Sequence, residues 1–190
     1  MKLKNLLILP LLASILLGAQ AQTTPTQPPA GGQTPPGGAP NQPPRVQNME
    51  PRKNISVHDP VMAKQGDTYY LFCTGRGIAI WSSKDLETWK PEKPVFETAP
   101  EWAVQAIPTF RNHIWAPDIS YHKGKYYLYY SVSAFGKNTS AIGVATNTTL
   151  HPTDKDYKWV DHGKVIQSFP GQTNWNAIDP NIITDKSGTP

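Results

Sequence analysis

Three aspartates recur along the chain at nearly equal intervals, each beside a proline. They lie in the motifs His58-Asp59-Pro60, Pro117-Asp118-Ile119 and Ile178-Asp179-Pro180, at spacings of 59 and 61 residues. A short predicted strand and then a glycine turn follow each motif, and the aromatic runs YYLF and YYLYY follow the first two turns. A period of this length predicts a repeat architecture, in which each unit buries its faces only against its neighbours.

Short runs of β-branched and aromatic residues, broken by Gly, Pro, Asn and Asp, follow the first two motifs. Four of them predict strands: residues 67–74, 78–82, 125–133 and 141–146. No window long enough for a helix has a period of 3.6, so we expect an all-β domain without helices.

Units of about 60 residues with four strands fit the blades of a β-propeller. The first blade is expected over residues 57–90 and the second over 115–160, while a third begins near Asp179 and stops just after Gly188. The first strand of a blade lines the central channel, so the three aspartates would converge there. About two and a half blades are present, and we interpret the chain as the N-terminal fragment of a longer protein.

The N-terminal 50 residues differ from this pattern. Residues 1–21 carry two lysines, an apolar run and an Ala-Gln-Ala cleavage site, which predicts a secretory signal peptide rather than a membrane span. Residues 22–50 are rich in Pro, Gly, Gln and Thr and predict a disordered linker. Residues 51–190 would then be the propeller part of a protein that is secreted to the periplasm or the outside of the cell.

Composition excludes several classes of function. The net charge is +4 with no basic run, which argues against a nucleic-acid partner. The single cysteine, Cys73, excludes an internal disulfide framework and a zinc site built from cysteines. The five histidines show no metal-ligand spacing. Six Trp and eight Tyr fit either a β-rich core or a surface that stacks on sugars.

The recurrence of Asp59 and Asp179 in the same frame is the strongest chemical signal. An isolated Asp-Pro is more often a turn residue, but two such carboxylates from different blades would meet in one channel. They would titrate at different pH values, so one can act as a base while the other tunes a neighbouring acid. Asp118 has two open readings, because it could face the same channel or orient a loop.

Aromatic residues near these motifs are candidate sugar contacts. Trp115 precedes Pro117-Asp118, and Phe135 with Gly136 lies in the loop after the next aromatic strand. They could stack on sugar rings, with glycine allowing close approach of substrate, or they could pack in the core. Trp81 and Trp89 occupy strand and turn positions typical of blade packing, so we assign both to the core.

The segments VHDPV (57–61), WAPDI (115–119), SAFGKNTSAIGVAT (133–146), VDHGKVI (160–166) and NAIDPN (176–181) together resemble the endo-1,5-α-L-arabinanases of glycoside hydrolase family 43. The resemblance implies a five-bladed β-propeller that hydrolyses arabinan with inversion. By motif, Asp59 would be the general base, and Asp179 would raise the pKa of the general acid and orient it. The acid itself would be a glutamate beyond the chain end.

The resemblance also implies substrate contacts and a metal. Trp115 and Phe135 would be the aromatic contacts, with Gly136, Asn176, Ala177 and Ile178 in the substrate subsites beside Asp59 and Asp179. The partner would be arabinan or a related plant pentose polysaccharide. Calcium would belong to the channel of the full-length protein, and no residue of this chain can be assigned as its ligand.

Three alternatives stay open at this point. The protein could be an exo-acting arabinofuranosidase or β-xylosidase of the same family, or a non-catalytic propeller that binds pentosans. The chain could also be an inactive fragment, since loss of a general acid costs about 10² to 10⁴ in rate.

Overall fold

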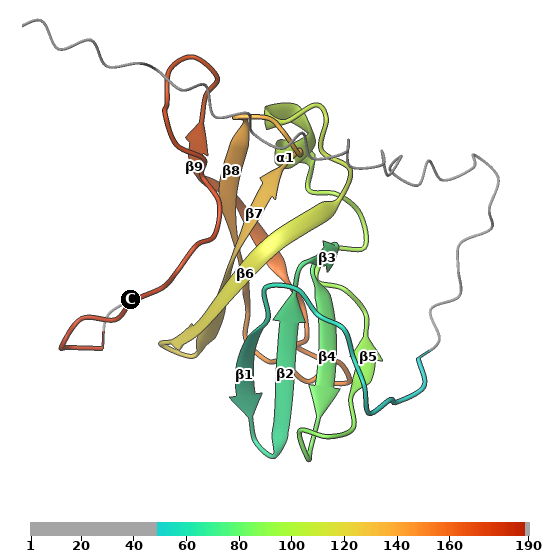
Figure 1. The fold of residues 1–190 in the computed structure, drawn as a ribbon. Helices are drawn as coiled ribbons and strands as arrows, with labels where there is room; N and C mark the ends of the chain where they lie inside the picture. The colour runs from blue at the N-terminus through green and yellow to red at the C-terminus, as the bar shows by residue number, and fades with distance from the viewer. Residues whose placement is uncertain (1–48, 189–190) are drawn as a thin grey trace, which may run out of the picture. The chain divides into compact units, whose positions relative to one another are not determined.

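The computed structural model describes residues 49–188, which form two antiparallel β-sheets and one short helix (Figure 1). The first sheet has the order β1-β2-β4-β5: β1 (Val61–Gln65), β2 (Thr68–Cys73), β4 (Ala79–Ser83) and β5 (Lys90–Glu92). The second has the order β3-β6-β7-β8-β9: β3 (Gly75–Arg76), β6 (His113–His122), β7 (Lys125–Ser133), β8 (Ser140–Asn147) and β9 (Val160–Ser168). The expected all-β class is confirmed.

The four predicted strands are all present, and β2 and β7 show the period-two burial of a sheet with one buried face most clearly. In β2, Thr68, Tyr70 and Phe72 are buried and the residues between them are half-buried. In β7, burial alternates in the same way before the strand becomes fully buried at its end. The expected signal peptide, residues 1–21, lies outside the described residues, as does the expected linker, residues 22–50, apart from its last two residues.

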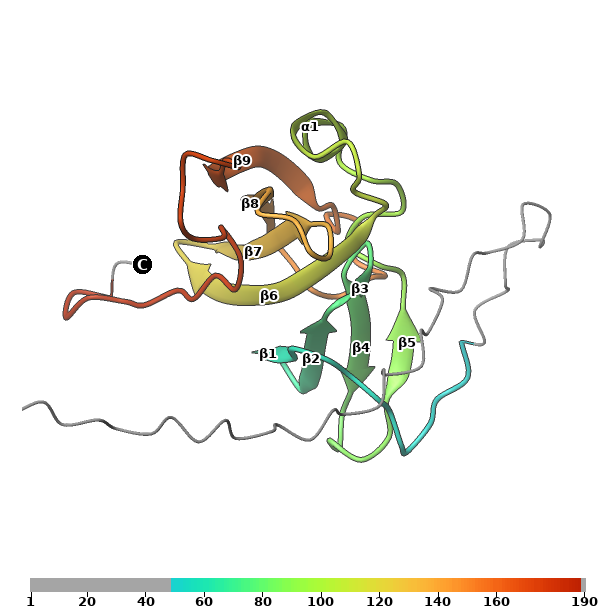
Figure 2. The ribbon, with the colours of Figure 1, turned by 45° about the horizontal axis from the view of Figure 1, so that its top comes forward.

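The two sheets meet where β6 lies against β1 and β2 (Figures 1 and 2). Between β2 and β4 the chain crosses to the second sheet, where β3 pairs with the start of β6. The fully buried side chains of Ile78 and Ile114 belong to the hydrophobic core at this junction. Buried apolar side chains therefore anchor the segments that carry the candidate site residues where the two sheets meet.

A short helix, α1 (Glu101–Ala106), departs from the expectation of a helix-free domain. Six residues are too few to show a helical period in the sequence. Its position depends on Trp102, whose indole N–H donates to Asp161 Oδ2 at 3.0 Å and whose ring packs on Tyr130. Tyr130 in turn donates its hydroxyl proton to Asp161 Oδ1 at 2.7 Å, so this cluster fixes the helix to β7 and β9.

Two expected boundaries are wrong. The second unit does not end near Val160, since β9 begins there and continues to Ser168. The expected strand after Asp179 is absent, because residues 180–184 pair with no strand among the described residues and a strand requires a ladder partner.

Of the two tryptophans assigned to the core, Trp89 is buried. Trp81 is only half-buried, and the Arg52 guanidinium lies over its ring at 5.2 Å from the centroid. The alternation that places Ile80 inside turns Trp81 to the opposite face of β4. The assignment of Trp81 to the core is therefore wrong.

Gly77 lies in the turn between β3 and β4 and should be the least replaceable of the described glycines. Its φ is +65°, and an added Cβ would lie 1.8 Å from the carbonyl oxygen of Phe96. Gly124 has a similar φ of +81° but open space around it, so it isolates the cost of backbone strain. We expect Gly124→Ala to lower the free energy of unfolding by about 1 to 2 kcal/mol and Gly77→Ala by about 1 to 3 kcal/mol more. Urea unfolding of both variants measures the difference, and equal losses would contradict the steric argument.

Candidate functional site

A pocket of about 440 Å³ opens where the segments before β1, after β2 and at the start of β6 approach the loop after β7 and the segment at Asp179. Its lining comprises His58, Asp59, Thr74, His113, Trp115, Phe135 and Asp179. It therefore brings together both candidate catalytic carboxylates and both candidate aromatic contacts.

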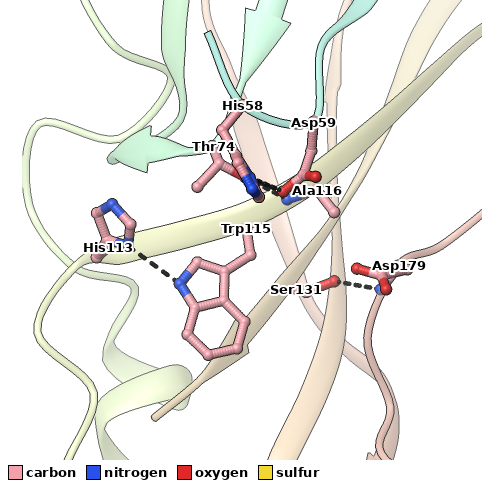
Figure 3. Close-up of polar contacts among 8 residues, drawn as sticks. All are labelled: His58, Asp59, Thr74, His113, Trp115, Ala116, Ser131 and Asp179. Carbon is pink, nitrogen blue, oxygen red and sulfur yellow. Dashed lines mark hydrogen bonds and ion pairs between the residues drawn. The ribbon is translucent and has the colours of Figure 1, made fainter. Parts of the chain in front are cut away.

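The carboxylate of Asp59 is held through one oxygen (Figure 3). Its Oδ2 accepts a hydrogen bond from the Thr74 hydroxyl at 2.7 Å and contacts His58 Nδ1 at 2.6 Å. A carboxylate only accepts hydrogen bonds, so the second contact requires a proton on Nδ1. Oδ1 accepts no hydrogen bond from the described residues, and the side chain is 38% exposed. One oxygen is therefore fixed while the other can meet solvent or substrate.

Asp59 and Asp179 share an unusual backbone conformation. Their φ angles are +49° and +53°, although each precedes a proline, which disfavours helical regions. Such backbone strain costs about 1 to 3 kcal/mol for each residue. It persists at Asp179 with the help of the buried Ser131 side chain, whose Oγ accepts the Asp179 N–H at 3.0 Å. The two Asp-Pro motifs therefore share a strained backbone conformation as well as their sequence.

Asp118 lies outside the pocket lining. Its Oδ1 accepts the N–H of Ile119 at 3.1 Å, and its Oδ2 accepts the N–H of Ile182 at 2.6 Å. Of the two readings left open by the sequence, the geometry supports the one in which Asp118 orients a loop. It holds the segment that follows Asp179.

The aromatic wall of the pocket consists of Trp115 and Phe135. Their ring centroids are 5.0 Å apart, and Phe135 is 88% exposed. The indole N–H of Trp115 donates to His113 Nδ1 at 3.0 Å, which fixes the orientation of the ring (Figure 3). Gly136 has a φ of +69° with no atom within 4 Å of the position of a Cβ, so the wall continues into open space.

The remaining candidate subsite residues do not line this pocket. The Asn176 side-chain oxygen accepts a hydrogen bond from Ser140 at 3.4 Å, Ala177 is buried, and Ile178 is half-buried. They form the segment that leads to Asp179.

Sequence reasoning missed three lining residues: His58, Thr74 and His113. The only available signal was the position of His58 next to Asp59. Thr74 and His113 carry no motif, because their roles arise from contacts across the junction of the sheets.

The candidate reactive groups of the pocket are the carboxylates of Asp59 and Asp179 rather than the thiol of Cys73. Burial raises the pKa of the neighbouring Cys73 thiol, and the negative charge of Asp59 adds to the rise, so at neutral pH the thiol is uncharged and a poor nucleophile.

Residues 49–188 contain no group of three or more His, Cys, Asp or Glu side chains that could hold a metal ion. In the same range, no helix is long and apolar enough to cross a bilayer.

Residues 49–190 match the family model described as Glycosyl hydrolases family 43. The chain is 59% identical over 136 residues to the extracellular exo-α-(1→5)-L-arabinofuranosidase ArbA of Cellvibrio japonicus, an alignment that covers 72% of this chain and 39% of that protein. It is 43% identical over 141 residues to the extracellular endo-α-(1→5)-L-arabinanase 1 of Bacillus subtilis, covering 72% and 42%.

Solved structures are similar in the same region. The α-L-arabinanase of Cellvibrio cellulosa in complex with arabinohexaose superimposes with a TM-score of 0.70 at 57% identity, over 72% of this chain and 43% of that chain. The chain spans about two fifths of the length of the curated relatives that it matches. With a family model that covers the whole described region and relatives this similar, the chain belongs to glycosyl hydrolase family 43.

Proposed function

We propose that these residues are part of a secreted glycosidase that cleaves internal α-1,5-L-arabinofuranosidic bonds of arabinan with inversion. The observation that carries the proposal is the pocket that holds Asp59 and Asp179, both with strained backbones, beside an exposed aromatic wall. The names of the similar proteins support arabinan as the substrate class and an extracellular location.

In this proposal Asp59 is the general base. Its Oδ2 is held by Thr74, so the free Oδ1 takes a proton from the water that attacks the anomeric carbon. Inverting glycosidases need this water between two carboxyl groups about 6.5 to 9.5 Å apart, while an acid protonates the leaving oxygen on the opposite face. Asp179 would raise the pKa of that acid and orient it. The acid is expected to be a glutamate, and none of the described pocket residues is one.

The aromatic wall would hold the sugar chain. A furanose ring has apolar C–H faces that stack on Trp115 or Phe135, and Gly136 leaves room beside them. Asn176, Ala177 and Ile178 would complete the subsites on the side of Asp179. The two sheets would be two blades of a five-bladed propeller.

An exo-acting arabinofuranosidase is the second candidate, because a relative at 59% identity is named as one. The products distinguish the two modes. An endo-acting enzyme releases arabino-oligosaccharides from linear arabinan at early times and lowers its viscosity quickly. Release of a single product size from the chain ends would instead assign exo action.

Replacement of Asp59 by asparagine should abolish turnover. The variant keeps the shape of the side chain but cannot take the proton, so we expect kcat to fall by at least about 10² to 10⁴. Binding of arabinohexaose, measured by titration calorimetry, should change little. The assay is release of reducing sugar from linear arabinan by the complete gene product that contains these residues.

Asp67→Asn is the matched control, because Asp67 also accepts a hydrogen bond from a threonine hydroxyl but is exposed and lies outside the pocket lining. We expect its kcat to stay close to that of the parent protein. An active Asp59→Asn variant would disprove the base assignment, and a parent protein that binds arabinohexaose without cleaving any arabinan would favour a pentosan-binding propeller.

Replacement of Phe135 by alanine should weaken substrate binding without destabilising the fold. The side chain is 88% exposed, and its ring contact is with Trp115. A lost stacking contact is worth about 0.5 to 1.5 kcal/mol, which corresponds to a rise of about two- to tenfold in KM for arabinohexaose. Phe169→Ala is the control, since Phe169 is also exposed but does not line the pocket. Equal KM values for both variants would argue against the aromatic wall as a subsite.

A further inference from the structure

We propose that Thr74 is a positioning residue that holds both the general base and the aromatic wall through one hydroxyl group. The inference rests on the proposed function of Asp59, and it adds a residue that no sequence motif indicates. Thr74 follows β2 directly and lies where the two sheets meet.

The backbone N–H and the hydroxyl group of Thr74 both have hydrogen-bond partners, and Figure 3 shows the surroundings of the hydroxyl group. Its backbone N–H donates to the carbonyl oxygen of His58 at 3.0 Å. Its hydroxyl donates to Asp59 Oδ2 at 2.7 Å and accepts the N–H of Ala116 at 2.8 Å. The residue therefore connects the segment before β1 with β6 of the other sheet.

The bond to Asp59 determines which carboxylate oxygen is available. The other group on Oδ2 is the ring of His58, whose side chain is 80% exposed. An exposed ring pays side-chain entropy to stay in one geometry and is screened by water, so it is a weak restraint. Thr74 is half-buried and β-branched, and its χ1 is restricted. Its hydroxyl is therefore the firm restraint that occupies Oδ2 and leaves Oδ1 without a hydrogen bond from the described residues.

The bond to Ala116 stabilises a β-bulge. The register of β6 on β7 shifts between Trp115 and Asp118, and Ala116 has a φ of +39°. Within this bulge Pro117 has no N–H, and the N–H of Ala116 uses the Thr74 hydroxyl as its acceptor. Bulges near active sites change the direction of a side chain, and this one directly follows Trp115. The same hydroxyl thus helps to set the direction of the indole in the aromatic wall.

The test uses three variants of the complete gene product that contains these residues. Thr74→Val keeps the shape and removes the hydroxyl, whereas Thr74→Ser keeps the hydroxyl and removes the methyl. Thr68→Val is the matched control, because Thr68 begins β2, the strand that Thr74 follows, and its hydroxyl also donates to a carboxylate, that of Asp67, at 2.9 Å, but away from the pocket. Arabinohexaose is the substrate, and thermal unfolding measures the stability of each variant.

We expect Thr74→Val to lower kcat/KM by about ten- to a hundredfold, the size of effect that follows loss of a hydrogen bond to a charged group. His58, His113 and Asp179, which also line the pocket, are unchanged in these variants. Thr74→Ser should restore most of the activity, and Thr68→Val should retain it.

A merely structural role would lower only the folded fraction, so the kcat/KM per folded molecule would stay that of the parent protein. A Thr74→Val variant with the parent kcat/KM per folded molecule would therefore overturn the proposal, as would a serine variant no better than the valine variant. If valine yields no folded protein, Thr74→Ala provides the same comparison. An active Asp59→Asn variant would remove the proposed function itself, whereas an inactive Asp59→Asn with an unaltered Thr74→Val removes only the role of Thr74.

Discussion

The packing of β6 against β1 and β2 is the contact on which the candidate site depends. Each sheet alone presents only part of the pocket, since Asp59 and Thr74 flank strands of the first sheet while Trp115 belongs to the second. The junction is apolar at its centre, with Ile78 and Ile114 fully buried, and polar at its edge, where Thr74 bonds Ala116. Burial of apolar surface holds the sheets together, and the hydrogen bond at the edge adds direction.

Three of the seven described non-glycine residues with positive φ angles lie at the same edge. Asp59, Ala116 and Asp179 all have positive φ angles, and each carries a hydrogen bond to a threonine or serine hydroxyl. A side-chain hydroxyl can both donate and accept, so it can satisfy a carboxylate or an N–H that has left the regular ladder. The hydroxyls of Thr74 and Ser131 are therefore what allows the chain to leave the strand geometry where the chemistry is proposed.

The sequence predicted the regular part of this structure well, because strands such as β2 and β7 have the period-two burial that a half-buried sheet requires. The repeated motifs also identified Asp59 and Asp179 as candidate site residues, and Trp115 and Phe135 were found near the second motif. It did not predict Thr74 or Ser131, whose bonds to Ala116 and Asp179 join residues 42 and 48 positions apart. Such contacts follow from how the sheets are arranged, and no local pattern encodes them.

The repeat also shows how equivalent positions come to differ. Asp118 lies in the middle of β6, downstream of a bulge, so its carboxylate meets the backbone of its own strand and of Ile182. Asp59 and Asp179 have left-handed backbone conformations, which take both residues out of the hydrogen-bond ladder of a sheet. One aspartate of the repeat therefore holds the chain that carries another, and its negative charge is satisfied by two N–H groups outside the pocket. In the proposed function, the structural carboxylate of Asp118 and the chemical carboxylates of Asp59 and Asp179 therefore differ in their backbone conformation.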